Sequence, residues 1–175
     1  MALTKVIGAG LGNLDENITF STASKGVHLG VTSATAANLL DDYEEGTFVP
    51  KFAFGGGTSG SSYAIRTGFY TKIGRLVYFT LRLELSARGS STGAITIEDL
   101  PFTTLSTSHS ESSAYVGFMD DGSSNFDTNN LTLVLDTNGT TIRVRRINSG
   151  SSGEFNQSDF GSTAQMIVSG TYMTS

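Results

Sequence analysis

Carboxylates gather at two places in this sequence, and a pair of carboxylates is the usual machinery for cleaving a glycosidic bond. Asp41, Asp42, Glu44 and Glu45 form the denser group. Adjacent residues of a chain point in different directions, so these acids would not converge on one bond. We interpret them as an acidic turn, or as a lid on the domain that follows, and we predict no catalytic residues.

The second group comprises Asp120, Asp121 and Asp127, in a segment of loop composition. Hard oxygen ligands of this kind can hold calcium, but the spacing of a calcium-binding loop is missing. His28 and His109 are far apart and belong to no His-x-His pattern. The sequence also has no cysteine, which excludes a thiolate zinc site and a cysteine nucleophile. We therefore predict no metal and no cofactor.

Arginines and loop aromatics are the better candidates for ligand contact. Arg143 and Arg145 share one face of a predicted strand, where they could hold an anionic sugar or phosphate, or pair with carboxylates across a subunit interface. An aromatic ring in a polar loop either stacks on a sugar or anchors its loop to the core. The candidate contact residues are Phe118, Asp120, Asp121, Phe126, Arg143, Arg145, Phe155 and Phe160.

The elements that would position these residues are strands. Residues 75–86 alternate strictly, which predicts a half-buried antiparallel strand with Val77 and Phe79 facing the core and Tyr78 facing away. Leucines at every second position over 131–135, the Asn138-Gly139 turn and a return through 142–144 predict a hairpin. Further predicted strands are 47–54, 63–73, 93–97, 113–119 and 165–173. The remaining intervals, including 148–153, have loop composition.

About eight short strands with almost no helix predict an all-β fold, an antiparallel β-sandwich or jelly-roll-like head. We place this head at residues 46–175 and an N-terminal attachment or stalk segment at 1–45. Within that segment, residues 33–46 favour a short helix or a turn. The N-terminal segment has too few apolar residues for a core of its own, which favours winding against other copies of the chain.

Composition narrows the function classes. Only 15% of the residues are charged, against about 25% in an average protein, so the surface is polar through Ser, Thr, Asn and Gly, as suits contact with glycans. A net charge of −5 argues against nucleic-acid binding. No apolar stretch is long enough to insert in a membrane, and the N-terminal residues do not have the pattern of a signal peptide.

Two long segments and three short ones resemble tail-fibre proteins of tailed phages, especially those of marine and cyanobacterial phages. The segment at residues 31–50, which contains LDDYEEGTFVP at 40–50, is similar to a segment of that family in which such a stretch opens the C-terminal domain. The sequence TGFYTKIGRLVY at residues 67–78 looks like the strand that follows it there. The segments KGVHLG at 25–30, SSTG at 90–93 and LPF at 100–102 resemble the family in order and spacing.

This resemblance implies a homotrimeric protein of the virion tail, attached through its N-terminal segment to a baseplate or tail protein, with a head that recognises host-surface polysaccharide without catalysis. We consider three functions, in order of preference: a receptor-binding fibre, a purely structural baseplate or neck appendage, and a glycan depolymerase. The resemblance fades after residue 103, so we expect the loops beyond it, at 120–130 and 148–160, to carry specificity.

Overall fold

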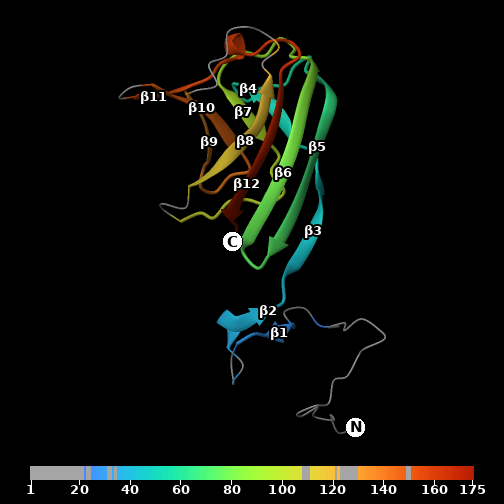
Figure 1. Cartoon of the computed structure of the whole chain (residues 1–175), viewed down its shortest axis with the longest axis vertical. Coiled ribbons are helices and arrows are strands. Elements are labelled where there is room, and N and C mark those ends of the chain that lie inside the picture. Colours follow the sequence, from blue (N-terminus) through green and yellow to red (C-terminus); the bar gives the residue numbers. More distant parts are fainter. Residues whose placement is uncertain are drawn as a thin grey trace. The chain divides into compact units, whose positions relative to one another are not determined.

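The computed structural model describes residues 22, 25–30, 33, 35–107, 111–120, 122, 130–148 and 151–175. The chain divides into two compact units, Met1–Asp41 and Asp42–Ser175 (Figure 1). In the described part of the first unit, β1 (Val27–His28) pairs with β2 (Leu39–Leu40), and η1 (Ala36–Asn38) is a single 3₁₀ turn. The expected helix or turn at 33–46 is thus limited to that turn.

The second unit is an antiparallel sheet of ten strands. The order across the sheet is β3-β5-β6-β12-β8-β9-β10-β7-β4, and β11 pairs with β10. The strands are β3 (Tyr43–Phe48), β4 (Lys51–Phe54), β5 (Ser62–Ile73), β6 (Leu76–Ala87), β7 (Ile95–Glu98), β8 (Ser112–Asp120), β9 (Leu131–Leu135), β10 (Ile142–Asn148), β11 (Ser151–Glu154) and β12 (Gln165–Met173).

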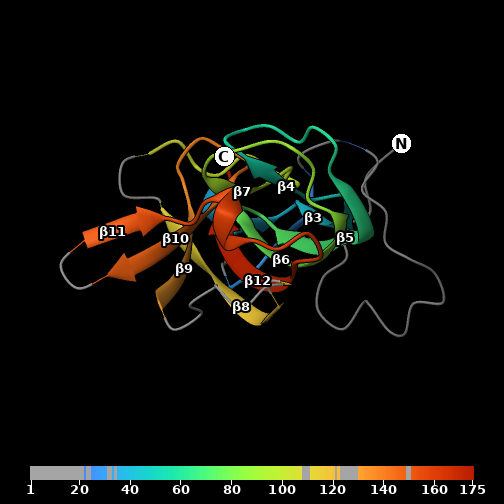
Figure 2. The same cartoon turned by 90° about the horizontal axis from the view of Figure 1, so that it is seen from above.

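The sheet curls on itself, so that β4 and β7 lie across from β6 and β12 with the core between them (Figure 2). Its two outermost strands, β3 and β4, are consecutive in the chain and are joined by Val49 and Pro50. The curl therefore brings the two edges of the sheet to one corner. The predicted all-β antiparallel fold class is confirmed, with both layers of the sandwich formed by one sheet.

The predicted alternation of β6 is confirmed, because every second side chain from Val77 to Leu85 is buried. Phe79 of β6 packs edge-to-face on Phe48 of β3 and on Tyr172 of the adjacent strand β12. The Tyr172 hydroxyl donates to the carbonyl of Phe102 and accepts from its N–H, so its polar atom is satisfied in the core. Burial raises the pKa of Tyr172 to about 12.

Two strand predictions need correction. The strand predicted at 47–54 is interrupted at Val49 and Pro50, and β3 begins earlier, at Tyr43, because the acidic run pairs along β5. Residues 148–153, predicted as loop, contribute β11, because Asn148 and Ser151 pair and extend the β10 hairpin. The predicted hairpin at 131–144 is confirmed in register: Ile142 lies opposite Leu135, and Asn138 has the left-handed backbone that such turns require.

Candidate functional site

The outer face of the long strands carries exposed aromatic rings. Phe69 on β5 is 54% exposed, Tyr78 on β6 48%, and Tyr115 and Phe118 on β8 76% and 47%. We call these four rings the aromatic face. Across the paired strands β5, β6, β12 and β8, Phe69 lies opposite Thr80, Thr80 lies opposite Ser169, and Ser169 lies opposite Tyr115. A row of two hydroxyl side chains therefore separates the rings of β5 and β8.

A bulge in β8 places both of its rings on this face. Tyr115 and Phe118 are an odd number of residues apart and would face opposite sides of a regular strand. The β8–β12 register shifts between Ile167 and Val168, which leaves Gly117 as the additional residue. Tyr115 then lies opposite Ser169, and Phe118 lies opposite Ile167. The Tyr115 and Phe118 rings therefore both point outward.

Two hollows flank Phe69. The larger, about 420 Å³, is shallow and lies along β3 and β5, with Glu45, Thr47 and Thr71 among its lining residues. The smaller, about 110 Å³, lies on the other side and is lined by Thr67, Thr80, Arg82 and Ile167. An aromatic ring between hydroxyl-rich hollows suits a ligand with alternating apolar and hydrogen-bonding faces, as sugars have.

The acidic run on β3 is held by partners on its own strand and on β5. Lys72 forms an ion pair with Asp42, and the Tyr70 hydroxyl donates to Glu44. On the outer side, the Tyr43 hydroxyl donates to Glu45 at 2.8 Å. These hydrogen bonds to carboxylates raise the pKa of Tyr70 and of Tyr43. The run thus diverges to both sides of the strand, as predicted from sequence, and does not form a facing pair of carboxylates.

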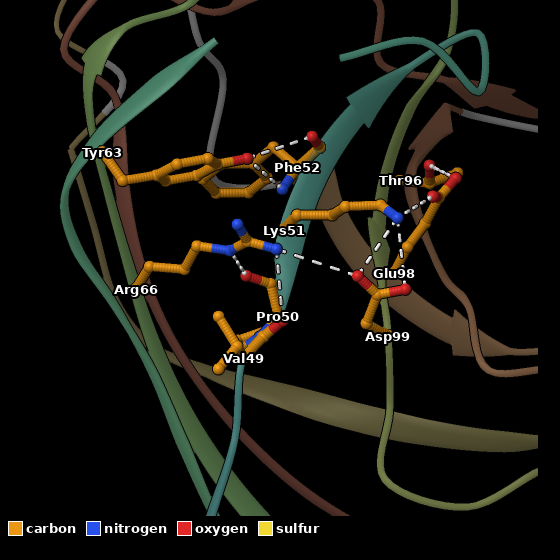
Figure 3. Close-up of polar contacts among 9 residues, drawn as sticks. All are labelled: Val49, Pro50, Lys51, Phe52, Tyr63, Arg66, Thr96, Glu98 and Asp99. Atoms are coloured by element: carbon orange, nitrogen blue, oxygen red, sulfur yellow. Dashed lines mark hydrogen bonds and ion pairs between the residues drawn. The ribbon is translucent and has the colours of Figure 1, made fainter.

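A polar cluster joins the two edges of the sheet where β3 passes into β4 (Figure 3). Lys51 on β4 lies 3.1 Å from Asp99 and 3.4 Å from Glu98, both at the end of β7. Arg66 on β5 donates through Nε to the carbonyl of Pro50 at 2.6 Å and lies 3.8 Å from Asp99. Its guanidinium also lies over the Tyr63 ring, 5.2 Å from the centroid.

Tyr63 completes the corner. Its hydroxyl accepts from the N–H of Phe52 at 2.9 Å and lies 3.2 Å from the Phe52 carbonyl (Figure 3). Burial raises the pKa of Tyr63, and the hydrogen bond with Asp99 raises that of Lys51. Glu98 and Asp99 are adjacent carboxylates, but both are ion-paired with Lys51. We therefore assign this cluster to closing the fold and not to chemistry on a substrate.

The predicted contact residues are not brought together. Phe118 belongs to the aromatic face, and Asp120 is exposed at the end of the same strand. Arg143 forms an ion pair with Asp136, and Arg145 shares its face of β10 as predicted. In the strand order only β9 separates β10 from β8, which carries Tyr115 and Phe118. Asp121 and Phe126 lie outside the described residues.

Two predicted contact residues are buried and are corrected here. Phe155 is 2% exposed beneath the Arg146 guanidinium, whose centre lies 4.4 Å from the ring centroid. Phe160 is 3% exposed and packs edge-to-face on Phe52 and Phe54. Both rings anchor their loops to the core, because the loop after β11 folds back over the core. This is the second of the two roles predicted from the sequence for a loop aromatic, the first being stacking on a sugar.

Sequence reasoning missed three rings of the aromatic face. Phe69 and Tyr115 were in predicted strands but were not singled out, and Tyr78 was predicted to face away from the core but was not among the candidate contact residues. The signal for Phe69 and Tyr78 was the phase of their strands, since their neighbours in sequence face the core. Tyr115 and Phe118 could not be placed together, because the bulge at Gly117 changes the phase of β8 between them.

Neither a cluster of metal ligands nor a membrane-spanning helix is found among the described residues. In the part of the chain that the structure describes, no three His, Asp or Glu residues gather closely enough to hold a metal ion. His28 lies exposed in β1, and His109 and Asp127 are outside the described residues. None of the described helices has the length and apolar character needed to span a bilayer.

Fold and site together define a curled, all-antiparallel head with an exposed aromatic face. Among solved structures, the Dettilon tailspike protein has the same fold, with a TM-score of 0.58 and 20% sequence identity over 75% of this chain. The chain spans about a quarter of the tailspike, 24% of its length. No protein-family model matches the chain, and no curated protein does.

Proposed function

We propose that this chain is the receptor-binding head of a phage tail fibre, that it assembles as a homotrimer, and that it recognises a host-surface glycan without cleaving it. The observation that carries the proposal is the aromatic face. Four rings between 47% and 76% exposed, alternating with threonine and serine hydroxyls, offer a stacking surface with hydrogen-bond partners beside it. The shared fold with a tailspike protein supports a place in the virion tail.

A binding role without catalysis fits the acids. Asp42, Glu44 and Glu45 each have a partner on β3 or β5, and Glu98 and Asp99 share Lys51. A glycosidase needs one carboxyl that protonates the leaving group and a second that faces it across the bond. Modest affinity at each head would be multiplied by three copies per fibre and several fibres per virion.

The test is binding of the purified, labelled chain to a glycan array, with a variant in which Phe69, Tyr78, Tyr115 and Phe118 are replaced by serine. Wild-type binding that the variant loses, with an unchanged thermal transition, supports the proposal. Native mass by light scattering should be three times 18.4 kDa. A monomer that binds no glycan would overturn it.

A structural appendage of the baseplate or neck is the second candidate, and one observation favours it. An apolar row crosses the same sheet in register, formed by Tyr43, Ile73, Leu76 and Met173, all exposed. Such a row suits contact with protein better than contact with sugar. A chain that binds no glycan but co-purifies as a stoichiometric complex with baseplate proteins would select this role. On either reading, we propose that the first unit, Met1–Asp41, provides the attachment.

A further inference from the structure

The two hollows beside Phe69 differ in charge from the arginine face of β10, and this difference bears on the class of sugar. Glu45 is the charged residue lining the larger hollow, and Arg82 is the charged residue lining the smaller one. On β10, by contrast, Arg143 and Arg145 point outward next to each other on one face. The hollows thus have one acidic and one basic lining residue, whereas the charged residues on this face of β10 are basic, with Arg143 paired to Asp136.

In the larger hollow, Glu45 lies opposite Thr71 and Thr47 lies opposite Phe69 on the paired strands β3 and β5. The Tyr43 hydroxyl occupies one acceptor position of the Glu45 carboxylate, while an ionised carboxylate has about four such positions. The others can accept hydrogen bonds from sugar hydroxyls. A uronic acid, sulfate or phosphate at this place would meet a like charge.

In the smaller hollow, the Arg82 guanidinium is already compensated. It donates to Glu84 at 2.9 Å and to the Gln165 side chain at 3.4 Å. An anionic ligand would have to compete with Glu84 for the same charge. The hydroxyls of Thr67 and Thr80, which line this hollow, have no such conflict and can both donate and accept.

We infer that the glycan bound by this head is uncharged and extends over at least two sugar residues, one on either side of Phe69. The Phe69 ring stacks on a sugar face, Glu45 with Thr47 and Thr71 takes the hydroxyls on one side, and Thr67 with Thr80 takes those on the other. This inference rests on the proposed function and narrows it to a ligand class and to one part of the aromatic face.

The experiment uses an array that carries both uncharged oligosaccharides and oligosaccharides with uronic acid, sulfate or phosphate groups. Binding should be confined to uncharged glycans, and Phe69→Ala should weaken it at least about tenfold, the equivalent of about 1.4 kcal/mol. Phe69→Tyr keeps the ring and should bind within about threefold of wild type. Ile147→Ala is the matched control, because it removes an exposed apolar side chain that lies outside both hollows and outside the aromatic face.

Glu45→Gln tests the charge directly. The glutamine oxygen still accepts the Tyr43 hydroxyl, but the negative charge is gone, so binding of uncharged glycans should persist and acidic glycans should begin to bind. Binding of acidic glycans by the wild type, with loss in Arg143→Ala, would overturn the inference and leave the proposed function intact. So would binding of uncharged glycans that Phe69→Ala does not weaken. Absence of binding to every glycan would overturn both.

Discussion

Gly68 of β5 lies directly opposite Phe48 of β3, and the Phe48 ring fills the space that a Cβ on Gly68 would need. A similar relationship links Gly46 of β3 to Tyr70, since a Cβ on Gly46 would lie 2.8 Å from the Tyr70 hydroxyl. The two long sequence segments that resemble tail-fibre proteins therefore pair with each other, and the glycine of each accommodates an aromatic ring of the other.

Replacing Gly68 with alanine should lower the free energy of unfolding by about 1–3 kcal/mol, because the added methyl displaces a buried ring. In a Phe48→Ala background the same substitution should cost little, since the obstructing ring is absent. Urea unfolding of the four proteins gives the coupling energy. Gly139→Ala is the control, as its nearest neighbour would be 3.9 Å away. If Gly68→Ala lowered the free energy of unfolding equally in both backgrounds, its effect would not come from the Phe48 ring.

Tyr172 predicts a loss of stability at alkaline pH. Its pKa is raised from 10.0 to about 12 by burial. Between these values the unfolded chain has lost this proton while the folded chain retains it, so stability falls as pH rises from 10 to 12. A shift of this size corresponds to about 3 kcal/mol.

Tyr172→Phe removes this titration and should flatten the pH dependence in that window. It should also cost about 1–3 kcal/mol at pH 8, because the N–H and carbonyl of Phe102 lose their partner in the core. Chemical denaturation at several pH values from 8 to 12 measures both effects. A variant that loses stability above pH 10 as steeply as the wild type would assign the titration to another group.

The third prediction concerns the bulge at Gly117 and its effect on stability. Phe118→Ala in the wild type should change stability by less than about 0.5 kcal/mol, because the ring is exposed. Deleting Gly117 removes the additional residue and joins Val116 directly to Phe118, so Val116 should still face the core and Phe118 should still face outward. Deleting Met119 instead should turn Asp120 toward the core, at a cost of about 1–3 kcal/mol, because its carboxylate would be buried without partners. Thermal unfolding should therefore show a smaller loss of stability for the Gly117 deletion than for the Met119 deletion, and equal losses would contradict the assignment of Gly117 as the bulge residue.

The corner cluster predicts a dependence on salt. Asp99 has a left-handed backbone, with φ of 68°, and pairs with Lys51. Asp99→Asn keeps a residue that tolerates this conformation and loses the charge, which should cost under about 1 kcal/mol, and less in 1 M NaCl. Asp99→Ala should cost more at both salt concentrations, because alanine tolerates the left-handed region poorly. Urea titrations at low and high salt distinguish charge from backbone; equal costs for the two variants would exclude the backbone effect.

The strands that could be predicted from sequence are those with one apolar face. Residues 75–86 alternate strictly in polarity, residues 165–173 are rich in apolar side chains, and β6 and β12 occupy nearly the predicted ranges. β3 and β11 could not be predicted, because YEEG and SSGE have no apolar face, and they are strands only through pairing with β5 and β10.

The candidate site could be predicted from the sequence less completely than the fold could. Phe118 and Phe155 have similar surroundings in sequence, yet one is exposed and the other is buried beneath Arg146. Whether a loop folds back on the core depends on the space that distant strands leave there, which composition does not record. Neighbours across the sheet, such as Phe69 and Thr80, likewise follow from strand order.

Strand order also governs when the sheet can form. β12 is the last of the described strands in the chain, yet it lies between β6 and β8 in the middle of the sheet. During synthesis, β3, β5 and β6 can pair on one side and β8, β9, β10, β7 and β4 on the other, and the two halves can meet at the corner cluster, but the gap between β6 and β8 stays open until residues 165–173 leave the ribosome. Each half meanwhile presents an open strand edge, on β6 and on β8, that invites pairing with a neighbouring chain. The head therefore completes folding only after its last strand is available, and a chain interrupted before that strand cannot join its two halves through β12.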